Sequence, residues 1–247
     1  MTFTLVEFFT FIISGFSLSL SIYCSIKLIS KYFQYKRIEF LYVGITGIII
    51  TEPWWPNFIN YFLILIGQGI LPFEIYNLIA LVGLPIGLFS WLYVFSELMY
   101  KNLQKEMLIF GVIYGMIFEI VVIPISIMDP MFTGTILGIG TFVIVSIFSF
   151  SFELVPLITG LLFAKVNLES EKLEIRLKGR FLVYAFVSFF ILGVIYSFYA
   201  LPPLLLSLIY VGLLSSAISF YYGFVSSKRM IKVFLRKKKS DNLIDSI

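Results

Sequence analysis

The spacing of basic residues along this apolar chain is the feature that most constrains its fold. The chain has 18 Lys and Arg residues, and long apolar stretches separate them into clusters at 27–37, 101–105, 165–180 and 228–239. Short loops on the cytoplasmic side of a membrane hold the excess of Lys and Arg. One arrangement places every cluster on that side, with seven transmembrane helices, the N-terminus outside and the C-terminus in the cytoplasm.

Composition indicates a membrane protein independently of the charge pattern. Hydrophobic residues make up 60% of the chain, charged residues make up 13%, and the mean hydropathy is +1.02. Soluble domains contain roughly a quarter charged residues. We therefore expect an all-α, polytopic integral membrane protein that is multi-pass in the cell membrane and has the lipid bilayer as its main partner.

The apolar stretches predict the positions of the spans and of one cytoplasmic extension. The expected spans are about 5–30, 38 to 61–65, 74–99, 106–128, 133–164, 180–201 and 204–226. The segment 165–179 mixes acidic and basic residues with leucines, so we expect helical extensions above the membrane there. The sequence leaves open whether 58–73 is a helix end, a loop or a re-entrant segment.

The chain divides into a transmembrane domain, 1–226, and a basic cytoplasmic tail, 227–247. The basic run 236–239 follows several apolar residues and would attract anionic lipid headgroups by ~1 kcal/mol per basic residue. The net charge of +4 lies along one expected membrane face, where topology already accounts for it. The charge therefore predicts no nucleic-acid partner.

The inventory of reactive side chains disfavours an enzyme. The chain has no His, the commonest general base and metal ligand, and its one cysteine, Cys24, lies in an apolar stretch. We find no paired-aspartate motif and no Ser or Cys nucleophile with a base beside it. We expect no enzymatic activity and no cofactor, and the sequence does not identify any metal.

The segment 51–57, TEPWWPN, lies inside the second expected span. Pro53 and Pro56 each lack a backbone donor and clash with the preceding turn, so the helix should kink or break there. Two interpretations of Trp54 and Trp55 stay open. They are residues of the aromatic belt at the membrane surface, or their ring N–H groups serve a helix break that lines a cavity, as in transporters.

Three glutamates come out at one depth in the expected membrane. At ~1.5 Å per helical residue, Glu52, Glu119 and Glu153 lie roughly 18–21 Å from the cytoplasmic helix ends. No Lys or Arg shares that depth, and an unpaired carboxylate in hydrocarbon is very costly. We therefore hypothesise a polar midplane cavity that binds a proton, a metal cation or a cationic ligand. The residues expected to complete it are Asn57, Asn60 and Tyr114, with Tyr196, Ser215 and Ser216 as further candidates.

A structural role for these acids is the alternative. A neutral Glu that hydrogen bonds to a backbone carbonyl beside a proline kink is an ordinary feature of membrane helices. Glu52 precedes Pro53 and Glu153 lies near Pro156, so both glutamates fit that description.

The span number and orientation resemble those of microbial rhodopsins, which need a Lys in the last span to bind retinal. Residues 213–216, Leu-Leu-Ser-Ser, occupy that region here, so the resemblance does not extend to a retinal site. The features above predict a transporter for a small solute or for a cation or proton. The alternative is a seven-helix membrane sensor or receptor that signals through a separate cytoplasmic protein partner.

Overall fold

The structure is a computed structural model that describes residues 4–124, 136–198 and 202–225. The described residues are helical throughout, apart from the turns and caps that join the helices, and they contain no strand. The elements are α1 (Leu5–Tyr35), α2 (Ile38–Ile49), η1 (Glu52–Trp54), α3 (Trp55–Leu65), α4 (Phe73–Leu81), α5 (Leu84–Met99), η2 (Lys101–Leu103), α6 (Gln104–Ile117), η3 (Phe118–Val122), α8 (Ile136–Leu168), α9 (Leu173–Phe198) and α10 (Pro203–Phe224).

Among the residues that the structure describes, five helical stretches are long and apolar enough to cross a membrane. Their bounds are Leu5–Tyr35, Phe73–Met99, Phe150–Leu168, Leu173–Tyr196 and Pro203–Phe224. The second and fourth expected spans are not among these five, and the helices of both are interrupted. The 3-10 turn η1 separates α2 from α3, and α6 passes into the π-helical turn η3. Many large apolar side chains on the helices are exposed, as lipid contact requires.

The helix ends follow from local sequence. Thr4 caps α1: its hydroxyl accepts a hydrogen bond from the Glu7 N–H at 3.2 Å, and the Glu7 carboxylate accepts one from the Thr4 N–H at 2.7 Å. At the other end Lys36 adopts the left-handed conformation, with a φ of 54°, and turns the chain into α2. The expected extensions at 165–179 are present, because α8 continues to Leu168 and α9 begins at Leu173.

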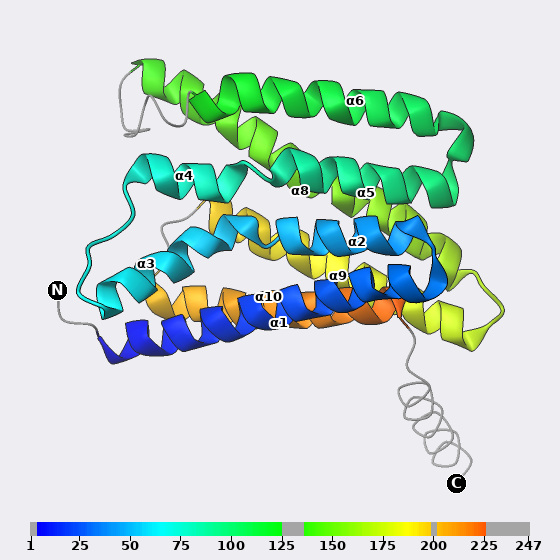
Figure 1. Cartoon of the computed structure of the whole chain (residues 1–247), viewed down its shortest axis with the longest axis horizontal. Coiled ribbons are helices and arrows are strands. Elements are labelled where there is room, and N and C mark those ends of the chain that lie inside the picture. Colours follow the sequence, from blue (N-terminus) through cyan, green and yellow to red (C-terminus); the bar gives the residue numbers. More distant parts are fainter. Residues whose placement is uncertain (1–3, 125–135, 199–201, 226–247) are drawn as a thin grey trace, which may run out of the picture.

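The contacts between the helices close into a ring, and Figure 1 shows these helices from the side. Around the ring α1 packs on α2, α2 on α5, α5 on α8, α8 on α9 and α9 on α10, and α10 packs against α1. Helix α6 packs on α5 and lies at the edge of the bundle. The first and last helices described are therefore neighbours, although they are far apart in the sequence.

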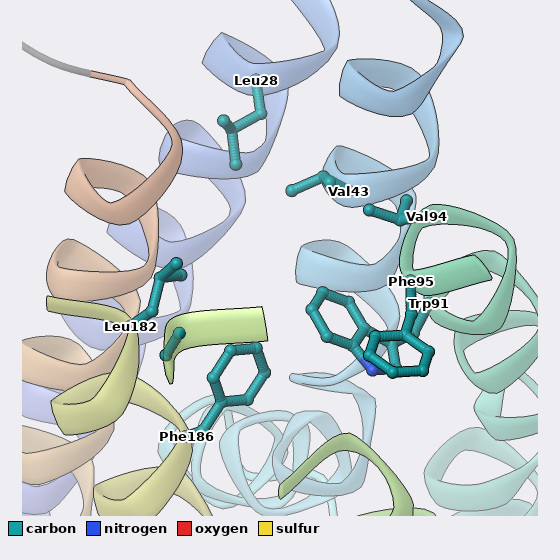
Figure 2. Packing of buried hydrophobic residues seen from close by; sticks show 8 residues of the cluster. Leu28, Val43, Trp91, Val94, Phe95, Leu182 and Phe186 are labelled. Carbon is teal, nitrogen blue, oxygen red and sulfur yellow. The ribbon is translucent and has the colours of Figure 1, made fainter. Parts of the chain in front are cut away.

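Trp91 of α5 joins four helices in the centre of the ring. Its ring packs against Phe186 of α9 and Phe220 of α10, with centroids 5.0 and 6.4 Å away. Its Nε1 donates a hydrogen bond of 2.7 Å to the Thr159 hydroxyl of α8. Figure 2 shows Trp91 and Phe186 in one buried apolar cluster with Leu28 of α1.

The described Lys and Arg residues gather at one end of the bundle, which we call the basic end. Figure 1 shows that the reversals between α1 and α2, between α5 and α6 and between α8 and α9 all lie there. Arg37 pairs with Glu39 at 2.8 Å, and Lys101 pairs with Glu97 at 2.6 Å. The neighbouring carboxylates raise the pKa of both basic groups. Both basic side chains are exposed, so these pairs contribute little stability. The tail 227–247 lies outside the described residues.

Small residues allow the helices to approach closely. Ser17, Ser21 and Ser25 of α1 are buried. A Cβ placed on Gly44 of α2 would lie 2.8 Å from the Ser25 carbonyl oxygen and also against Ile29. Because helices in lipid associate by such close packing, the seam between α1 and α2 depends on Gly44 having no side chain.

We expect Gly44→Ala to lower the free energy of unfolding by about 1–3 kcal/mol, the usual cost of overpacking. The Ser25 carbonyl is backbone and cannot move aside as a flexible side chain would. Denaturant titration of the purified protein in detergent micelles measures the change. Gly69→Ala is the matched control, because nothing lies within 4 Å of a Cβ at Gly69. Equal stabilities of the two variants would contradict the prediction.

Candidate functional site

The helix of the second expected span is interrupted at the proline pair. Helix α2 ends at Ile49, Pro53 lies in the 3-10 turn η1, and α3 begins at Trp55 with Pro56 in its first turn. Proline is accepted at the start of a helix, where the missing N–H would have no partner. The two prolines therefore begin a new helical segment here and do not merely bend an existing one.

Tyrosines from two other helices bind the carbonyls at this break. The Tyr196 hydroxyl donates to the Pro53 carbonyl at 3.4 Å, and the Tyr210 hydroxyl donates to the Trp54 carbonyl at 3.5 Å. Tyr196 also accepts a hydrogen bond from the Asn57 amide, and its oxygen lies 3.3 Å from the Tyr76 hydroxyl. These bonds supply the partners that a broken helix in a membrane requires.

The two tryptophans of the break differ in burial: Trp54 is buried in the core and Trp55 is half-buried. Trp54 is 2% exposed and packs against Phe189 and Tyr196, so it is a core residue and not part of a surface belt. Trp55 is half-buried, and its Nε1 donates a hydrogen bond of 3.0 Å to the Thr51 hydroxyl. Neither ring N–H binds a carbonyl freed by the prolines.

The Glu52 side chain extends from this helix break toward the turn between α4 and α5. Its side chain is 6% exposed, and the Gly83 N–H donates a hydrogen bond to its carboxyl group. Gly83 lies in the turn between α4 and α5 and is the N-cap of α5. The Glu52 carboxyl group therefore lies at the N-terminal end of α5. The second carboxyl oxygen, Oε2, is buried and has no hydrogen-bond partner.

Glu119 approaches the same region from a third interruption. It lies in the π-helical turn η3, and its carboxyl group is close enough to Glu52 for an electrostatic interaction. One turn earlier, Gly115 lies close to Pro85 of α5, which brings α6 against the start of α5. We call Glu52, Gly83 and Glu119 the acidic junction. Three interrupted helical stretches meet there, and such interruptions are frequent at functional sites.

Glu153 is placed against a different helix. A Cβ added at Gly193 of α9 would lie 2.6 Å from the Glu153 carboxyl oxygen Oε1, so this side chain packs on α9. Within the described ranges no three acidic or cysteine side chains form a group that would hold a metal ion. The expected cavity shared by the three glutamates stays a prediction.

The other expected cavity residues have separate partners. Tyr114 hydrogen bonds to the Ser151 hydroxyl of α8, and the Asn60 amide oxygen accepts a 2.7 Å hydrogen bond from the Leu71 N–H. Asn60 thus holds the turn between α3 and α4, within the segment that the sequence left open. Ser215 lies 2.8 Å from the Tyr184 hydroxyl, and Ser216 donates to the Ala185 carbonyl at 2.8 Å.

Gly83 and Tyr76 are the residues of this region that sequence reasoning did not find. A signal for Gly83 existed, because Pro85 follows it at the start of α5 and marks a helix beginning. Comparison of the whole chain with family models, with curated proteins and with solved structures found no match.

Proposed function

We propose that the protein is a seven-helix transporter of the cell membrane that moves a proton or small cation, or a solute coupled to one, past the acidic junction. In this proposal α2 with α3 forms the second span and α6 with η3 begins the fourth. The gathering of Lys and Arg at the basic end supports placing that end in the cytoplasm and the N-terminus outside.

The observation that carries the proposal is the buried Glu52 carboxyl group with one unpartnered oxygen. A buried polar atom without a partner costs about 1–3 kcal/mol, and more when it is charged. A bound proton or cation removes that cost, and the nearby Glu119 carboxyl group strengthens the attraction for a positive charge. Interrupted helices at mid-membrane depth are where secondary transporters bind their ions.

The test is ion flux into proteoliposomes that contain the purified protein. Gradients of H⁺, Na⁺ and K⁺ are applied one at a time, and the flux is followed with a trapped ion-sensitive dye. We expect the wild-type protein to conduct at least one of these ions. We expect Glu119→Gln to reduce that flux by about ten-fold or more, since an amide neither titrates nor attracts a cation as a carboxylate does.

The matched control is Glu74→Gln, which removes an exposed carboxyl group from the first turn of α4. This variant should conduct as the wild type does. The proposal would be refuted if ion flux into vesicles with the wild-type protein were no faster than flux into protein-free vesicles under all three gradients. If ion flux through the Glu119→Gln variant equalled that of the wild type, the role of the acidic junction in transport would be refuted.

A further inference from the structure

A partly open space lies on the other side of the break at Pro53. It is a cavity of about 50 Å³ bounded by α1, α2, α9 and α10. Along α1 it extends from Leu28 near the basic end to Ser17, about 16 Å at ~1.5 Å per residue. At its inner end it is lined by Thr51 and Trp54, the residues on either side of Glu52 and Pro53.

The hydroxyl groups that line this cavity have already used their protons. Ser21 and Ser25 donate to carbonyls one turn back at 2.8 and 2.9 Å, and Thr46 does so at 2.9 Å. Ser17 and Ser216 donate to carbonyls of neighbouring helices at 2.9 and 2.8 Å. A hydroxyl oxygen keeps its lone pairs after its proton is donated. The wall of the cavity is mostly apolar, and the hydroxyl oxygens of these lining residues can still accept hydrogen bonds.

Trp54 adds a donor that has no acceptor. Its side chain lines the cavity and is 2% exposed, and its Nε1 is buried without a hydrogen-bond partner. Buried polar groups in this position are commonly satisfied by ordered water. One water needs about 10–15 Å³ of such space and two to four polar partners, so a cavity of about 50 Å³ has room for a short file of waters.

We propose that this cavity is a hydrated passage, in which water molecules carry protons between the basic end and the level of Glu52. The ligand class is water and the excess proton that it conducts. Acceptor oxygens stand along α1 at every fourth residue, at Ser17, Ser21 and Ser25, and the unpartnered Trp54 N–H marks the inner end. The claim that the passage leads protons to Glu52 rests on the proposed function. Its hydration is a separate claim with a separate measurement.

The chain carries its own reporter for water in this space. Cys24 is its only cysteine and lines the cavity. A thiol reacts as a thiolate, which forms in water and not in hydrocarbon. The probe is Ag⁺, which is applied as silver nitrate to membrane vesicles in which the basic end of the protein faces the medium. After unfolding in detergent, the thiols still free are counted with a fluorescent maleimide.

The matched control carries a thiol on the lipid side of the same helix. In Cys24→Ser/Ile26→Cys the new thiol replaces a side chain that is 52% exposed on the outer surface of α1. We expect Ag⁺ to block Cys24 at least about ten-fold faster than this control. Filling the cavity by Ser21→Leu, or from another helix by Ala217→Leu, should slow the block of Cys24 to the control rate.

A dry cavity would overturn the inference, and Cys24 would then react no faster than the lipid-facing thiol. It is equally overturned if both filling variants leave the reaction of Cys24 unchanged. Because the readout is thiol chemistry and not flux, the passage can fail while the acidic junction still conducts. The junction can likewise fail while the passage proves to be hydrated.

Discussion

Gly83→Ala is expected to destabilise the protein by about 3 kcal/mol, because the added methyl group overpacks the site and displaces a buried carboxyl group. An added Cβ would meet the Glu52 carboxyl group, whose carbon would lie 2.7 Å away. Glu52 would have to leave the Gly83 N–H and the N-terminus of α5 together. Denaturant titration in detergent micelles measures the loss of unfolding free energy.

The same substitution in a Glu52→Ala background separates this cause from a general backbone effect. With the carboxyl group removed, the space beside Gly83 opens and the cost of the added methyl group should fall close to zero. The double-mutant cycle then yields an interaction energy of about 2–3 kcal/mol, in the upper range for residues in contact. A cost that stays the same in both backgrounds would show that Glu52 is not held at Gly83.

Trp91→Ala should be the most destabilising single truncation in the ring, at about 3–5 kcal/mol. Trp91 is 1% exposed and touches Phe186 and Phe220, so its removal leaves a void between α5, α9 and α10. It also leaves the Thr159 hydroxyl of α8 without its indole donor. The same titration in micelles reports the unfolding free energy.

Two further variants separate the contribution of ring packing from that of the hydrogen bond and provide a surface control. Trp91→Phe keeps most of the ring packing and loses the hydrogen bond, so we expect a cost of about 1–2 kcal/mol. Ile109→Ala truncates a side chain of α6 that is 48% exposed, and it should change stability by less than about 0.5 kcal/mol. A loss at Trp91→Ala no larger than that at Ile109→Ala would contradict a central role for Trp91.

The helix ends were predictable because proline acts locally. Pro53 and Pro56 determine where the second span breaks, and Pro203 begins α10, since a missing backbone donor has the same effect in any environment. The buried serines of α1 are four residues apart, so they lie on one face of the helix.

The helix against which each glutamate side chain packs was not predictable in the same way. Counting residues along a helix gives the depth of a side chain but not the direction in which the helix has rotated about its axis. Glu153 lies against Gly193 of α9, whereas Glu52 lies against Gly83 at the start of α5. The rotation depends on which helices are neighbours, and the ring order is set by packing across the whole chain.

The adjacency of α1 and α10 has a consequence for biosynthesis. Thr10 lies 2.8 Å from the Ser207 hydroxyl, and Ser17 donates to the Tyr210 carbonyl, so part of the polar face of α1 is completed by α10. A ribosome makes α1 long before it makes α10. The nascent first helix must therefore wait in the lipid, or beside the insertion machinery, with this seam uncovered until translation is nearly finished.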